Sequence, residues 1–131
     1  MNSKDIKAIN LSAEILMYGH IILEASLEDN NGHIVLASAP DGYADDIRKT
    51  DISASQFGSI AQAAVSFLEN QDIPTEEGSS NCSIIVMDKS EEVQSYNWPD
   101  TLSPVAFKGI ADIINIFLKD EILADFLEMF Y

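Results

Sequence analysis

Basic residues are scarce in this chain of 131 residues. It contains 7 Lys and Arg against 22 Asp and Glu, a formal net charge of −15, and Arg48 is the only arginine. Proteins that bind nucleic-acid phosphates or anionic membranes need clustered cations, whereas these seven are scattered along the sequence. The scarcity therefore excludes ordinary direct binding to nucleic acid and to a membrane surface.

Cysteine and long apolar runs are also nearly missing. The single cysteine, Cys82, excludes an internal disulfide. Charged residues in the first seven positions interrupt the apolar stretch that a secretion signal requires. The apolar runs fall far short of the roughly 20 residues that cross a bilayer. These absences predict a cytoplasmic protein.

Motifs for cofactors and catalysis are absent as well. The six glycines are isolated, so none forms a phosphate-binding loop. Nucleophilic catalysis needs a base close to a nucleophile and a group that orients it, and the chain offers only His20, His33 and Cys82 for these roles. We expect no cofactor and no enzymatic activity.

Two groups of oxygen-bearing side chains raise the alternative of a metal site. Asp41, Asp45 and Asp46 lie within six residues, and a second group alternates around a turn at Asp29, Asn31 and His33. Such groups are typical ligands of divalent cations. Neither group has the spacing of a calcium-binding loop, so a solvated loop is the interpretation we adopt, and ion binding at Asp41, Asp45 and Asp46 stays open.

What the chain does have is enough apolar content, 47% of its residues, to bury a core within a single domain spanning residues 1–131. Apolar residues occupy every second position from Ile9 to Leu27, which predicts two strands broken near Tyr18 and Gly19 or one strongly bent strand. Asn31 and Gly32 predict the hairpin turn into a third strand over 33–39. Residues 40–51 are predicted to form a polar loop.

The first helix has a clear start signal. Ser53 as N-cap and Gln56 three residues later form a capping box, and Ile52 and Phe57 form a hydrophobic staple. The helix is predicted to end near Asn70. A polar linker over 74–81 follows, and then a second hairpin whose strands cover 83–87 and 92–98.

The start signal is repeated before the C-terminal helices, with Ser103 as N-cap and Pro104 at the first helical position. The apolar stripe over 110–117 changes phase afterwards, so we expect a break near Lys119 and Asp120 and a last helix reaching almost to Tyr131.

The element order β-β(-β)-α-β-β-α-α predicts an α+β fold, an antiparallel sheet of two hairpins with helices packed on one face. In the second hairpin, Trp98 is predicted to pack in the core, with Tyr96 pointing the same way. The order of hairpin, Tyr96–Asp100 segment and Pro-started helix in the C-terminal third is similar to small bacterial emfourin-type protease inhibitors. No residue role is transferred from that resemblance.

The charge excess favours one class of function. A field of this size steers association with a basic surface, so we expect a non-enzymatic acidic protein that inhibits or neutralises a basic partner. Toxin-immunity proteins and phage anti-defence proteins, anti-CRISPR proteins and nucleic-acid mimics among them, have this composition. The residues expected to contact the partner are Asp41, Tyr43, Asp45, Asp46 and Asp51.

The alternative is an assembly module. The out-of-phase apolar residues near the C-terminus cannot share the stripe of the preceding helix, so we expect them to stay partly exposed and to form a homodimer or a docking site. These residues are Ile122, Phe126, Leu127 and Phe130.

Overall fold

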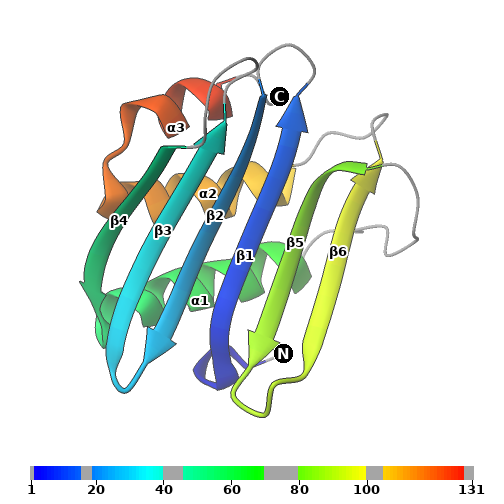
Figure 1. Cartoon of the computed structure of the whole chain (residues 1–131). Helices are drawn as coiled ribbons and strands as arrows, with labels where there is room; N and C mark the ends of the chain where they lie inside the picture. Colours follow the sequence, from blue (N-terminus) through cyan, green and yellow to red (C-terminus); the bar gives the residue numbers. More distant parts are fainter. Residues whose placement is uncertain (1, 16–18, 40–45, 70–79, 100–104, 129–131) are drawn as a thin grey trace.

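The fold is an antiparallel sheet with helices on one face, as the sequence predicts (Figure 1). The computed structural model describes residues 2–15, 19–39, 46–69, 80–99 and 105–128. Its elements are a 3₁₀ turn η1 (Ser3–Asp5), the strands β1 (Ile6–Ile15), β2 (Gly19–Glu28), β3 (Asn31–Ala39), β4 (Asp46–Ser53), β5 (Ser80–Asp88) and β6 (Val93–Pro99), and the helices α1 (Ala54–Glu69), α2 (Val105–Leu118) and α3 (Glu121–Leu127).

The six strands lie in the order β4-β3-β2-β1-β5-β6, and every neighbouring pair is antiparallel. The predicted loop over 40–51 is wrong from residue 46 onward, because β4 pairs with β3 and places Arg48 beside Leu36. This strand forms one edge of the sheet. An edge strand with charged side chains lacks the apolar alternation that reveals a half-buried strand, which is why the sequence pattern missed it.

The turn between β2 and β3 lies two residues earlier than predicted. Asp29 and Asn30 have the positive φ angles, 49° and 66°, and Asn31 and Gly32 already belong to β3. Gly32 serves packing: a Cβ atom there would lie 2.5 Å from Cγ1 of Ile52. The predicted break between the first two strands is confirmed, since β1 ends at Ile15 and β2 begins at Gly19.

The capping box of α1 is confirmed. The backbone N–H of Gln56 donates to Oγ of Ser53 at 3.0 Å, and the N–H of Ser53 donates to Oε1 of Gln56 at 2.9 Å. Ile52 and Phe57, the two residues of the predicted staple, are both buried. The sequence therefore sets both the start of α1 and the side of the helix that faces the sheet.

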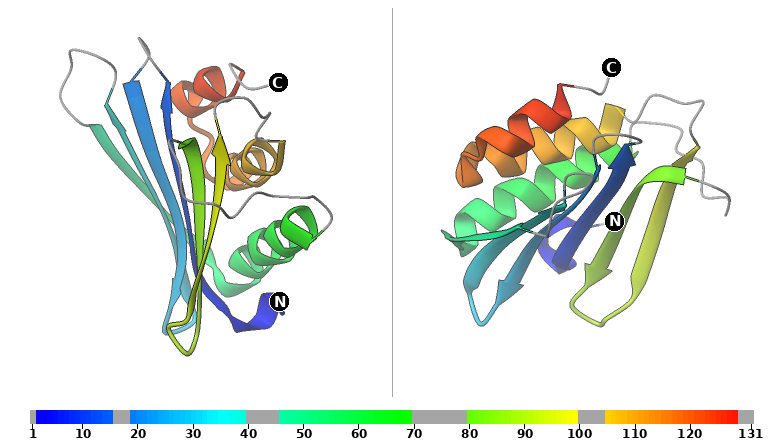
Figure 2. Two further views of the ribbon diagram at one scale, coloured as in Figure 1. Left: turned by 90° about the vertical axis from the view of Figure 1, so that its right-hand side faces the viewer. Right: turned by 45° about the horizontal axis from the view of Figure 1, so that its top comes forward.

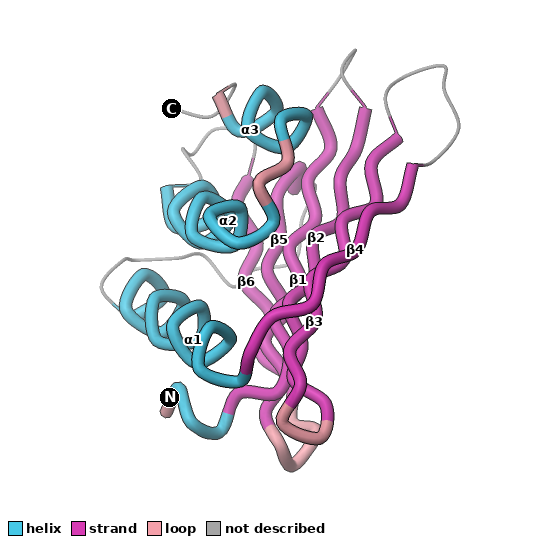
Figure 3. Tube along the Cα trace, turned by 90° about the vertical axis from the view of Figure 1, so that its left-hand side faces the viewer, coloured by secondary structure: helices cyan, strands magenta, loops and turns pink. Residues whose placement is uncertain are grey.

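The core lies between the sheet and the helix layer, which Figure 2 and Figure 3 show from the side. Gly109 lets α2 approach α1, because a Cβ atom there would lie 2.4 Å from Cζ of Phe67. Trp98 is buried in this core, as predicted, and Tyr96 packs against it on the same face. Burial and the nearby Glu69 raise the pKa of Tyr96. The expected helix start at Ser103 and Pro104 lies outside the described residues.

The break between α2 and α3 is confirmed. Lys119 has a positive φ of 56°, and Asp120 is the N-cap of α3, its Oδ1 accepting from the N–H of Leu123 at 2.8 Å. This left-handed residue redirects the chain, so that the apolar residues of α3 turn toward the sheet. Among the described residues, no helix combines the length and the apolarity needed to span a membrane.

Candidate functional site

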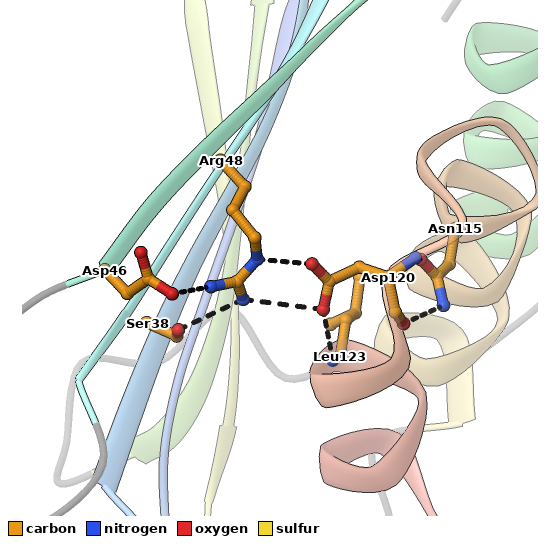
Figure 4. Close-up of polar contacts among 6 residues, drawn as sticks. All are labelled: Ser38, Asp46, Arg48, Asn115, Asp120 and Leu123. Atoms are coloured by element: carbon orange, nitrogen blue, oxygen red, sulfur yellow. Dashed lines mark hydrogen bonds and ion pairs between the residues drawn. The ribbon is translucent and has the colours of Figure 1, made fainter.

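A polar network links the edge strand β4 to the start of α3 (Figure 4). The guanidinium of Arg48 donates to both carboxylate oxygens of Asp120, to Asp46, and to Oγ of Ser38 at 3.2 Å. The side chain of Asn115 accepts from the backbone N–H of Asp120 at 2.8 Å and donates to its carbonyl at 3.1 Å. Four elements, β3, β4, α2 and α3, are thus joined by polar contacts.

This network fixes structure. The side chain of Asp120 is only 9% exposed and that of Arg48 25%, and Asp120 also caps α3. Charge-assisted, bidentate contacts of this kind are strong and directional. The network therefore holds α3 against the sheet edge and withdraws the single arginine from the surface.

Acidic side chains gather on the outer side of the same region. Glu121, Asp125 and Glu128 are exposed on α3, with spacings of four and three residues that place them on one side of the helix. Asp46 on β4 shares Arg48 with Asp120, the residue before Glu121. We call Asp46, Glu121, Asp125 and Glu128 the acidic edge.

The residues expected to contact a partner do not form one cluster on β4. Asp46 is paired beside Ser38 on the helix side of the sheet, whereas Asp51 pairs with His33 on the opposite side. The remaining three, Asp41, Tyr43 and Asp45, lie outside the described residues. The Arg48 network instead joins Asp46 to Asp120 at the start of α3, the helix whose exposed acidic residues sequence reasoning did not single out. Their spacing along the helix was the available signal.

The expected exposure near the C-terminus is wrong for two of the four residues. Phe126 and Leu127 are buried, together with Leu123, because the turn at Lys119 rotates their stripe toward the core. Ile122 is exposed, as expected, and Phe130 lies outside the described residues. The exposed apolar side chains of α3 are therefore Ile122 and the small Ala124.

The catalytic and metal candidates stay apart. Cys82 is buried in β5 and forms no disulfide. Nδ1 of His33 lies 2.9 Å from Oδ1 of Asp51, and His20 is paired in register with Glu14 at the far end of β2. Within the described residues, no group of three His, Cys, Asp or Glu side chains is arranged to hold a metal ion.

Two of the surface hollows are lined by described residues. One, of about 490 Å³, is lined by η1 and the β5-β6 hairpin, including Asp5, Asp88 and Glu92. Oδ1 of Asp88 accepts there from Oγ and N–H of Ser90, at 2.7 and 2.9 Å, so this carboxylate stabilises the hairpin turn. The other hollow, of about 250 Å³, contains Ser12 and Ser83, whose hydroxyl oxygens lie 2.7 Å apart.

The described residues leave the opposite surface of the sheet uncovered. All three helices lie on one side, and no described element lies on the other (Figure 3). We call this surface the open face. Four of the seven large hydrophobic residues that are exposed within the described ranges point there, namely Ile22, Ile47, Ile85 and Val93.

Comparison with known proteins gave no match: no protein-family model, no curated protein and no solved structure is significantly similar to this chain. Any functional conclusion therefore rests on the geometry and charge of the chain itself.

Proposed function

We propose that this protein is a non-enzymatic acidic binding protein, acting in the cytoplasm, that inhibits or neutralises a basic partner protein. One observation carries the proposal. In the described part of the chain, thirteen acidic side chains are exposed but only four basic ones, Lys4, Lys49, Lys89 and Lys119. The exposed charges of these residues are thus strongly one-sided, and the network at α3 takes up Arg48, the single arginine of the chain.

The acidic edge is the proposed contact surface. Its α3 carboxylates are held on a short helix that the Arg48 network fixes to the sheet, so they are presented without large motion. Preorganised charges of one sign speed encounter with a surface of the opposite sign and disfavour wrong partners. Basic protein surfaces of this kind occur on nucleic-acid-binding proteins and on many toxins, which are the partner classes we propose.

Affinity capture with matched variants tests this function. The parent chain, an edge variant (Asp125→Lys with Glu128→Lys) and a control variant (Glu28→Lys with Glu92→Lys) are immobilised and exposed to lysate of the source organism. All four positions are exposed, and both variants change the net charge equally.

We expect the parent and the control to retain the same basic protein and the edge variant to lose it. The retained protein is then purified, its dissociation constant for each variant is measured, and its own activity is assayed with and without the parent. The proposal is wrong if no basic protein is retained, if both variants bind it alike, or if its activity is unaffected.

A further inference from the structure

The open face combines apolar side chains with uncharged polar ones and carries little charge in its central rows. Its side chains form rows across β5, β1, β2, β3 and β4, fixed by the strand register. The three central rows consist of Ser83, Ser12, Ile22, Ala37 and Ile47; of Ile85, Asn10, Glu24, Val35 and Lys49; and of Met87, Ala8, Ser26, His33 and Asp51.

Only three of these fifteen positions carry a full charge. Two of the three charged side chains contact a neighbouring polar side chain, and the third lies at the edge of the sheet. Glu24 accepts from Nδ2 of Asn10 at 3.3 Å, Asp51 contacts His33, and Lys49 lies on the edge strand β4. With histidine neutral, the three rows have a net charge of −1, although the chain as a whole carries −15.

We propose that the open face binds a second copy of this chain, forming a dimer in which two sheets pack face to face. The distribution of charge over the surface favours a second copy of the chain as the binding partner of this face. Two copies repel each other through almost every other surface, and this face is the one where close approach costs least. In these rows a basic protein would find only Glu24 and Asp51 as complementary charges, and a nucleic acid only Lys49.

Size and shape agree with this occupant. The six-stranded face, with strands about 4.8 Å apart and roughly nine residues long at about 3.3 Å per residue, covers roughly 800 Å², and Glu14 and Glu28 lie in its two end rows beyond the three central rows. A standard stable interface buries about 800 Å² on each partner. The large side chains of Ile22 and Ile85 alternate with small side chains at Ser12, Ala37 and Ser83. The resulting uneven surface allows the side chains of two packed sheets to interdigitate. A twofold axis in the interface brings the same patch together from both copies.

The oligomeric state of the full chain tests this proposal. Light scattering and sedimentation, run at up to about 100 µM protein, are expected to show a dimer for the parent. Ile22→Lys and Ile85→Lys, at positions 43% and 40% exposed, are expected to weaken dimerisation about tenfold or more. Ile47→Lys, at a position 60% exposed on the edge strand, is a second probe that leaves the central strands unchanged.

Ile122→Lys on α3 and Ile116→Lys on α2 are the controls, because both positions are exposed on the helix side. They are expected to dimerise like the parent. Circular dichroism confirms that each variant is folded. A monomeric parent overturns the proposal, as does a dimer that survives all three face variants or that Ile122→Lys disrupts. These results are independent of the capture experiment, since none of the five isoleucine variants replaces a residue of the acidic edge.

Discussion

Arg48 lies between two carboxylates, that of Asp120, which is almost buried, and that of Asp46, which is exposed. It contacts Asp46 and Asp120 at once, and the fork of a guanidinium suits such shared contacts better than an ammonium group. The position of this residue explains how so acidic a chain tolerates an almost buried aspartate at the N-cap of α3.

Replacing this arginine tests its role in stability. Arg48→Ala is expected to lower the free energy of unfolding by about 2 kcal/mol, because Asp120 is left mostly buried without its counter-charge. Lys49→Ala, the exposed neighbour, serves as the control and should change it by no more than about 0.5 kcal/mol. Urea denaturation measures both. Equal effects would show that the network does not hold α3.

Asp88 offers a test at a single titrating group. Hydrogen bonds, first from the hydroxyl of Ser90 and then from backbone N–H groups, lower the pKa of this carboxyl below 3.8. Its stabilising contribution is therefore present above that pH and is lost as the pH falls through the lowered pKa. Ser90→Ala should raise the pKa of Asp88 toward 3.8, as measured by NMR titration. An unchanged pKa would mean that the hydroxyl makes no such bond in solution.

At the scale of elements, the features that depend on local sequence were predicted correctly, and those that depend on tertiary contacts were not. The start of α1, the second hairpin and the break before α3 follow from caps, turns and periodicity near each site, and all were predicted. The strand β4 was missed because Arg48 and Thr50 occupy its helix-facing positions in place of apolar residues. The predicted exposure of Phe126 and Leu127 was wrong because one residue in the left-handed conformation, Lys119, changes the direction of the chain between α2 and α3.

The same reasoning explains how much of the candidate site could be predicted. Asp46 was found from composition, but its proximity to Glu121 depends on contacts between residues more than 70 positions apart. The open face was equally hidden, since an alternating strand pattern does not reveal whether anything covers its polar side.

The capping box of α1 predicts a measurable helix contribution. Ser53→Ala removes the acceptor for the N–H of Gln56 and should cost about 1 kcal/mol in the free energy of unfolding. Ser53→Asp keeps an acceptor and should stay close to the parent. Chemical denaturation checks both, and equal stability of Ser53→Ala and the parent would contradict the cap.

Two glycines of neighbouring elements should respond in opposite directions. Gly58 is exposed within α1 and a Cβ atom there meets nothing within 4 Å, so Gly58→Ala should stabilise the protein by about 0.5–1 kcal/mol. Gly32→Ala should destabilise it by about 1–3 kcal/mol, because the new methyl group overlaps Ile52. Thermal unfolding distinguishes them, and a shift of the same sign in both would contradict the packing at Gly32.

For the whole molecule, the two proposals assign different binding partners to different surfaces. The acidic edge is charged, lies beside α3 and is proposed to contact a basic partner. The open face is nearly neutral in its three central rows, lies on the far side of the sheet and is proposed to contact a second copy. A dimer built in this way leaves both acidic edges accessible, so one assembly would present two binding surfaces.

The dependence of partner affinity on salt tests the proposed function most directly. For the captured basic protein, the dissociation constant with the parent chain should rise about tenfold or more between about 0.05 M and about 0.5 M NaCl, because added ions screen the exposed carboxylates. The edge variant Asp125→Lys with Glu128→Lys should bind more weakly at low salt and show a shallower dependence. An affinity that is indifferent to salt, or equal for parent and edge variant, would contradict binding through the acidic edge.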